Sequence, residues 1–148
     1  MIFLMHGFIG SGKTTRAKAL EREFGALRFS PDEWMSVLFG SDPPASEFPT
    51  HLTDLLVLFE SIWIPAARSG TPVILDYGFW TRASRSRMEE RLAELGLPFT
   101  WVVLDTSIEE CRARNQARQG SAKSDLNITD VTFDHFLQQF EPMESRLL

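Results

Sequence analysis

The feature that most constrains this chain lies within its first fourteen residues. Residues 7–14 read Gly-Phe-Ile-Gly-Ser-Gly-Lys-Thr and match the pattern G-x-x-x-x-G-K-[ST] at every specified position. Glycines let a backbone approach a ligand without Cβ clashes, and consecutive backbone N–H groups in such a loop can surround phosphate oxygens. The segment therefore predicts binding of a nucleoside triphosphate, and the competing interpretation is a flexible Gly/Ser turn.

The flanking residues supply the local structure that this motif requires. Residues 2–5 form a short apolar run typical of a buried strand. Residues 13–24 follow a helical period, with Ala17, Leu20 and Phe24 on one stripe. A strand, a glycine loop and a helix are thus predicted in the order that a phosphate-binding loop needs.

Composition restricts the size of the fold and the kind of partner. The chain has 148 residues, of which 43% are hydrophobic, and its net charge is −5. This length suits a single domain spanning residues 1–148. Twelve of the fifteen basic residues are arginines, whose planar fork suits phosphate, whereas a general nucleic-acid surface more often brings net positive charge. The balance argues against long DNA or RNA as the principal partner.

Cys111 is the only cysteine, so an intrachain disulfide is excluded and a cytoplasmic protein is expected. Its arginine-rich surroundings offer no evident base, which favours a packed thiol over a nucleophile. The apolar start lacks the basic flank and the length of a signal peptide. No run approaches 18 apolar residues, so no membrane partner is expected, and the sequence leaves the oligomeric state open.

Strands and helices are predicted to alternate along the rest of the chain. This alternation predicts an α/β fold of three layers, with a mostly parallel sheet of about four to five strands covered by helices on both faces. A segment with three prolines is predicted to be a loop over residues 40–51. The further strands are expected at 26–29, 72–76 and 99–105, and the further helices from Pro31, at 53–68, from Thr81 to Leu95, at 108–118 and at 133–140. Three of the helix ends have predicted caps, which are Gly25 after the first helix, Ser30 before the second and Thr81.

Ligands of such sheets bind beyond the carboxyl ends of the strands, and three polar positions satisfy that rule. The glycine loop follows the first strand, Asp32 follows the second and Asp76 closes the third. Asp76 has the form of a Walker-B carboxylate that would hold Mg²⁺ through water, although a strand-end Asx turn is the alternative. Asp32 could accept the proton of an attacking hydroxyl. Alternatively, it could only stabilise the helix, as a negative charge in the first turn that interacts with the helix dipole.

The arginines fall into two helical groups. Arg114 and Arg118 are four residues apart on one face and could close over a triphosphate. Most of the others are expected to be surface residues, paired with Glu89, Glu90, Glu109 and Glu110. The two groups are Arg82, Arg85, Arg87 and Arg91 after the third strand, and Arg112, Arg114 and Arg118 after the fourth.

Taken together, these motifs resemble the P-loop kinases grouped with polynucleotide kinase, chloramphenicol phosphotransferase and zeta toxin. The resemblance extends nearly from end to end of the chain. Residues 7–14 match the Walker A segment, and Ser30-Pro31-Asp32 resembles the motif whose Asp is the general base. Residues 76–82 resemble the D-x-[TG]-x-x-x-R region, residues 114–118 the R-N-x-x-R lid, and residues 140–142 the closing segment.

The resemblance implies an ATP- and Mg²⁺-dependent kinase with a lid around residues 112–127, and it adds Arg85 as a possible contact to acceptor or phosphate. Asp76-Tyr77-Gly78 replaces the usual Asp-Thr-Asn of polynucleotide kinases, and no strongly basic acceptor groove is evident. We therefore expect transfer of the γ-phosphate to a hydroxyl of a small molecule. A polynucleotide 5′-hydroxyl kinase and an ATP-binding switch or ATPase without an acceptor are the alternatives.

The predicted site residues follow from the motifs and the resemblance. Asp32, Lys13 and Arg118 are the predicted catalytic residues, and Thr14 and Asp76 are the predicted Mg²⁺ ligands. The residues predicted to bind the nucleotide are Gly7, Gly10, Ser11, Gly12, Lys13, Thr14, Thr15, Arg114 and Arg118.

Overall fold

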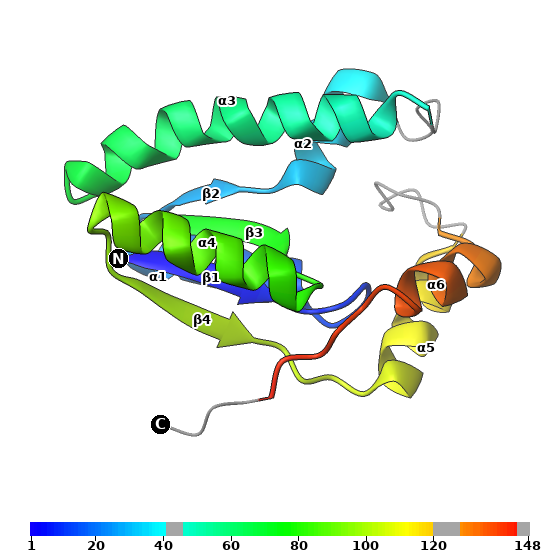
Figure 1. The fold of residues 1–148 in the computed structure, drawn as a ribbon. Coiled ribbons are helices and arrows are strands. Elements are labelled where there is room, and N and C mark those ends of the chain that lie inside the picture. The colour runs from blue at the N-terminus through cyan, green and yellow to red at the C-terminus, as the bar shows by residue number, and fades with distance from the viewer. Residues whose placement is uncertain (41–45, 120–127, 145–148) are drawn as a thin grey trace.

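A parallel sheet carries the fold (Figure 1). The computed structural model describes residues 1–40, 46–119 and 128–144. Its four strands run in the order β2-β3-β1-β4, and every neighbouring pair is parallel, which confirms the predicted α/β class. The strands are β1 (Ile2–His6), β2 (Leu27–Phe29), β3 (Val73–Gly78) and β4 (Phe99–Val103).

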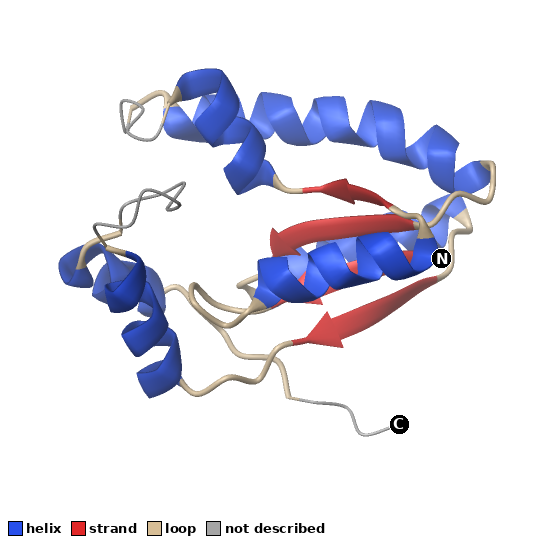
Figure 2. Cartoon of the chain, turned by 180° about the vertical axis from the view of Figure 1, so that it is seen from behind, coloured by secondary structure: helices blue, strands red, loops and turns tan. Residues whose placement is uncertain are grey.

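Helices cover both faces of this sheet and its carboxyl end. The side chains of α1 pack on one face, whereas α3 and α4 pack on the other. Figures 1 and 2 show α5 and α6 beyond the arrowheads of the strands. The helices are α1 (Lys13–Phe24), α2 (Pro31–Phe39), α3 (Phe48–Arg68), α4 (Arg82–Leu95), α5 (Ile108–Arg118) and α6 (Asp130–Leu137).

Alternation along β3 decides which side chains face each layer. Ile74 packs in the cluster with α1, and Leu75 packs in the cluster with α3 and α4. Successive side chains of a strand point to opposite faces, so Asp76 lies on the α1 side and Tyr77 on the α3–α4 side. The neighbouring residues Asp76 and Tyr77 thus face the two opposite helical layers.

The predicted helix caps are confirmed. Ser30 accepts a hydrogen bond from the Glu33 N–H at 3.5 Å, and Thr81 accepts one from the Ser84 N–H at 3.1 Å. Such caps satisfy backbone donors that the first helical turn leaves free. Gly25 ends α1 with a φ of 61°, a left-handed conformation that glycine adopts readily.

The structure corrects several predicted boundaries, among them the end of β4, which lies at Val103 rather than at residue 105. The predicted 40–51 loop is wrong over its last residues, because α3 already begins at Phe48; Pro49 is compatible with a first turn, where its missing N–H is not needed. Residues 41–45 of that loop lie outside the described residues. The last helix spans Asp130–Leu137 rather than 133–140, because Thr129 caps it through the Thr132 N–H at 3.3 Å. β3 continues two residues beyond Asp76.

After α6 the chain returns to the carboxyl end of the sheet. The Glu141 N–H donates to the Trp80 carbonyl at 2.8 Å, and the Met143 N–H donates to His6 Nε2 at 3.1 Å. His6 Nε2 is therefore an acceptor, which leaves Nδ1 to donate to the Phe79 carbonyl at 3.0 Å. Burial lowers the pKa of His6, which agrees with this neutral tautomer.

Arg85 ties this returning segment to the turn after β3. Its side chain is buried, and Nη1 donates to the Phe79 carbonyl at 2.8 Å and to the Glu141 carbonyl at 3.0 Å. Phe79 has a φ of 47°, which is unusual for a residue other than glycine. Two donors thus converge on the carbonyl of a strained residue, and they hold the turn in place.

We expect Arg85→Met to lower the free energy of unfolding by about 1–3 kcal/mol, because the Glu141 carbonyl loses its side-chain donor and the Phe79 carbonyl keeps only His6. The matched control is Arg82→Met, on the same helix, whose side chain is 83% exposed and should change stability by less than about 0.5 kcal/mol. Urea unfolding followed by circular dichroism measures both. Equal effects of the two substitutions would contradict this structural role of Arg85.

Candidate functional site

The glycine loop joins β1 to α1 and packs directly against α5. Gly10 has a φ of 79°, and a Cβ built there would lie 2.4 Å from the Cys111 carbonyl oxygen. Only glycine fits this position without a shift of backbone. The Thr106 hydroxyl adds a hydrogen bond to the Ser11 carbonyl at 2.8 Å. Cys111 is buried, as expected for a packed thiol.

The start of α1 presents free backbone donors. Gly12 occupies the N-cap position with a φ of 88°, and no side chain caps the helix there. The first N–H groups of a helix have no partner within it, and the helix dipole favours negative charge at that end. This end of α1 is therefore suited to an anion such as phosphate.

Lys13, Thr14 and Asp76 form one cluster at the base of the loop. The Lys13 ammonium forms a close ion pair with Asp76 Oδ1, and the Thr14 hydroxyl donates to Asp76 Oδ2 at 3.3 Å. The Asp76 side chain is fully buried. Its carboxylate therefore contacts the loop, and the alternative of a local Asx turn finds no support in these contacts.

The oxygens of this cluster are of the kind that Mg²⁺ prefers. Thr14 Oγ1 and Asp76 Oδ2 lie 3.3 Å apart, so a single ion or its bound water could contact both. Among the residues that the structure describes, no group of three or more His, Cys, Asp or Glu could hold a metal by itself. A site completed by substrate phosphates and water is the arrangement that fits these residues.

Asp32 lies in the first turn of α2, where Ser30 already provides the cap. The adjacent acid, Glu33, forms ion pairs with Arg28 at 3.1 Å and with Lys18 at 3.7 Å. The side chain of Asp32 has no hydrogen bond or ion pair with any other described residue. It is therefore not needed for the cap, and its carboxylate stays available.

The surroundings of Asp32 connect it to the loop. Asp32 is an exposed residue, yet the protein atoms around its carboxylate raise its pKa through desolvation. The positive charge of Lys13 lowers the pKa, whereas the negative charges of Asp76 and Glu33 raise it further. The carboxylate of Asp32 thus lies within the electrostatic reach of the Lys13–Asp76 pair.

The two predicted clamp arginines differ in their surroundings. Arg114 reaches the loop, with Nη1 donating to the Gly10 carbonyl at 3.3 Å and Nη2 pairing with Glu110 at 2.7 Å. Arg118 is the last residue of α5, is exposed, and makes no hydrogen bond or ion pair with other described residues. The remainder of the predicted lid, residues 120–127, lies outside the described residues.

Trp80 is a contact of the loop that sequence patterns did not reveal. Its indole Nε1 donates to the Gly7 carbonyl at 3.2 Å, and its ring packs 5.1 Å from that of Phe8. Trp80 is therefore part of the wall that fixes the loop from the β3 side. The sequence carries no periodic signal for this contact, because 73 residues separate the partners.

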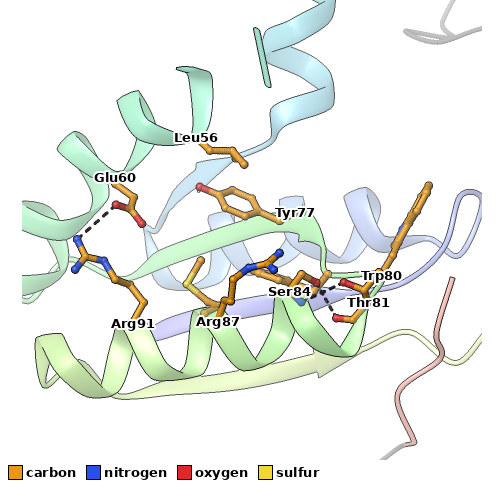
Figure 3. Close-up of a pocket in the computed structure, with 10 residues that line it drawn as sticks. Leu56, Glu60, Tyr77, Trp80, Thr81, Ser84, Arg87 and Arg91 are labelled. Carbon is orange, nitrogen blue, oxygen red and sulfur yellow. Dashed lines mark hydrogen bonds and ion pairs between the residues drawn. The ribbon is translucent and has the colours of Figure 1, made fainter. Parts of the chain in front are cut away.

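A groove of about 560 Å³ lies between α3 and α4, on the opposite face of β3 from the loop. Figure 3 shows Tyr77 on its floor and Arg87 extending into it from α4. Arg91 pairs with Glu60 at 3.6 Å, as expected for a surface arginine. Glu89 was expected to pair with an arginine and instead accepts from the Trp101 indole at 2.7 Å.

The chain was compared with curated protein sequences and with solved structures. Curated protein sequences give no match to it. Among solved structures, a chain of the Pnkp1/Rnl/Hen1 RNA repair complex matches with a TM-score of 0.71 and 21% identity, over 99% of this chain but 50% of that one.

Two further structures match over most of both chains. Kti12 from Chaetomium thermophilum in complex with ADP-AlF3 has a TM-score of 0.69 and 16% identity, covering 97% of this chain and 82% of that one. The Mycobacterium tuberculosis APS kinase CysC in complex with AMPPNP and APS has a TM-score of 0.60 and 18% identity, covering 93% and 95%.

These likenesses establish that the chain shares the fold of these structures. In the described part of the chain, no helix has both the length and the apolar character needed to cross a membrane. A family profile described as "AAA domain" matches residues 2–143. Because the match includes nearly the whole chain and contains the phosphate-binding loop, the protein belongs to this AAA-domain family.

Proposed function

We propose that the protein is an ATP-dependent phosphotransferase that moves the γ-phosphate to a hydroxyl of a small-molecule acceptor. The observation that carries this proposal is the position of Asp32. Its carboxylate does not cap α2, and it is close enough to Lys13 and Asp76 for their charges to change its pKa. A nucleotide-binding switch has no need of such a carboxylate. The nucleotide complexes of Kti12 and APS kinase are consistent with ATP as the donor.

The loop would bind and orient the phosphates. The free N–H groups at the start of α1 and the Lys13 ammonium would donate to phosphate oxygens, and Arg114 would approach from α5. Thr14 and Asp76 would hold Mg²⁺, directly and through water. When bound, Mg²⁺ would neutralise charge that develops on the phosphates during transfer. Arg118 is proposed to join Arg114 on the nucleotide phosphates.

Asp32 would act on the acceptor. Its carboxylate would accept the proton of the acceptor hydroxyl while the hydroxyl oxygen forms its bond to the γ-phosphorus. The bond from that phosphorus to the bridging oxygen of ADP breaks in the same step, and the electron pair leaves with ADP. A raised pKa makes a carboxylate a stronger base, provided that it remains ionised at the working pH.

We expect Lys13→Ala to reduce ATP turnover by at least about 10³-fold, because it removes several kcal/mol of charge stabilisation in the transition state. Lys18→Ala is the control, since Lys18 is on the same helix, is half exposed and pairs only with Glu33 among described acids. Phosphate release measures both. Because Lys13→Ala also leaves Asp76 buried without its partner, circular dichroism should confirm folding. Turnover at the wild-type rate would exclude the loop as the active site.

Asp32→Asn should leave ATP affinity nearly unchanged and reduce phosphoryl transfer by roughly 10² to 10⁴. Glu33→Gln, which removes the neighbouring charge in the same helical turn, should retain activity, because Glu33 faces Arg28 and Lys18. Calorimetry with an ATP analogue and a transfer assay separate binding from chemistry. Slow hydrolysis of ATP, with water as the acceptor, offers a first readout. Normal transfer by Asp32→Asn would favour the switch instead.

The acid limb of the activity profile should lie above the ordinary aspartate pKa of 3.8, because the pKa of Asp32 is raised and only its deprotonated form acts as a base. Activity should rise with pH through this pKa. The raised pKa also means that the folded state binds the proton more tightly than the unfolded state. The contribution of Asp32 to stability is therefore present at low pH and is lost as pH rises through the folded pKa.

Asp32→Asn should then unfold at an equal or higher urea concentration than the wild type at pH 7, since the variant lacks the unfavourable charge. If Asp32 only stabilised the helix through its dipole, Asp32→Asn would instead unfold at a lower urea concentration than the wild type. Measurement of kcat/KM between pH 4 and 8, together with urea midpoints, tests both expectations. An acid limb that is unchanged in Asp32→Asn would assign that limb to another group.

A further inference from the structure

The groove between α3 and α4 is adjacent to the phosphate-binding loop, because the two sites contact neighbouring residues of β3. Asp76 contacts Lys13 on one face of β3, and Tyr77 lies on the floor of the groove on the other face (Figure 3). The groove also reaches Phe79 and Trp80, and Trp80 contacts the phosphate-binding loop through the Gly7 carbonyl. A molecule in this groove would therefore have one end close to the loop.

Aromatic contacts also connect the groove to the helix of Asp32. Trp34, two residues after Asp32, packs edge-to-face on Phe59 of α3, with ring centroids 5.0 Å apart. Phe59 in turn lies 6.3 Å from Tyr77, centroid to centroid. The start of α2 and the floor of the groove thus belong to one packed unit, so Asp32 has a fixed position relative to the groove.

The charges along the groove do not cancel. Glu60 is paired with Arg91, which also approaches Glu94 at 4.0 Å. Arg82, at the start of the same helix, is paired with Glu141. The exposed side chain of Arg87 lines the groove and forms no ion pair or hydrogen bond with another described residue. Its guanidinium is thus a positive charge at the groove that has no partner among the described residues.

The floor of the groove adds a neutral donor. The Tyr77 hydroxyl is buried and has no hydrogen-bond partner among the described residues. Burial raises the pKa of Tyr77, an effect that the Trp63 indole partly offsets, although the two groups do not meet in hydrogen-bond geometry. The phenol therefore keeps its proton at neutral pH, and it is a neutral donor that a ligand could reach only if neighbouring side chains moved.

The remaining wall of the groove is largely apolar, with Leu56, Met88 and Phe79 among its residues. A volume of about 560 Å³ is within the range of small-molecule sites. Apolar walls suit a carbon skeleton, and a guanidinium suits carboxylate or phosphate by paired hydrogen bonds. A nucleic-acid strand would be expected to meet several cations along its path, whereas this groove offers one unpaired arginine.

We propose that this groove binds the acceptor, and that the acceptor is a small molecule with a carboxylate or phosphate group that Arg87 recognises. The anionic group would lie away from the hydroxyl that Asp32 activates, with the carbon skeleton along the apolar wall and over Tyr77 on the floor. This inference rests on the proposed function. Arg87 is thus a specificity-determining residue of the acceptor site.

The test uses three probes that share a ring and a hydroxymethyl group: para-(hydroxymethyl)benzoate, para-(hydroxymethyl)phenyl phosphate and the uncharged para-(hydroxymethyl)benzamide. Each is titrated into the full chain, with AMPPNP and Mg²⁺ present, and followed by amide NMR shifts. We expect at least one anionic probe to perturb groove residues around Tyr77 and Arg87 and to bind about tenfold or more tightly than the amide. The tighter anion distinguishes carboxylate from phosphate recognition.

Arg87→Gln should weaken the anionic probe about tenfold or more and leave the amide unchanged. Arg82→Gln, which removes the same charge from the same helix outside the groove, should change neither. Equal binding of acid and amide, equal effects of the two substitutions, or no shifts in the groove at millimolar probe would each overturn the proposal. The last outcome would leave Arg87 as an ordinary solvated surface residue.

A transfer assay with the same probes keeps this inference separate from the proposed function. Phosphorylation of a probe hydroxyl that is independent of Arg87 would support the phosphotransferase and overturn the anion recognition. Arg87-dependent binding in the groove without transfer to any hydroxyl would support the anion recognition and count against the assignment of the groove as the acceptor site. Arg87-dependent binding with transfer supports both.

Discussion

The contact between Lys13 and Asp76 is the constraint on which the site depends, because it joins the phosphate-binding loop to β3, one of the two interior strands of the sheet. Asp76 is fully buried, and removing a carboxylate from water is costly unless a charge and hydrogen bonds replace the water. Lys13 and Thr14 provide both. The register of β3 therefore decides the fold and the chemistry together, since a slip by one residue would send Asp76 to the opposite face.

The loop depends on neighbours that are distant in sequence. Thr106 and Cys111 contact it from the β4–α5 side, and Trp80 contacts it from the turn after β3. That turn includes Phe79 in a left-handed conformation, with its carbonyl bound by two buried donors. Hydrogen bonds from residues distant in sequence thus hold the strained backbone of Phe79 in place beside the site. Backbone strain of this kind is common around functional sites.

Sequence reasoning recovered the parts of the site that depend on local spacing. The loop at 7–14, the cap at Ser30 and the alternation of strands and helices are all set by residues close in the chain, and the structure agrees with them. The start of α3 was wrong because Pro49 was taken as a breaker, although a proline is accepted in a first turn. Contacts such as Arg85 with Glu141 lie beyond such reasoning, because 56 residues separate the partners and no pattern links them.

The arginines show why a residue type alone could not assign roles. Four of them share α4, yet Arg82 is exposed, Arg85 is buried against two carbonyls, and Arg91 pairs with Glu60. Only Arg87 faces the groove without a partner among the described residues. The difference arises because the 3.6-residue helical period points these arginines to different sides of α4, and the sheet covers only one side. The sequence does not show which side is covered, because its arginines are closely spaced and point to several sides. If Arg87 binds the acceptor, the acceptor and the phosphates are bound on opposite faces of β3, beside the neighbouring residues Tyr77 and Asp76.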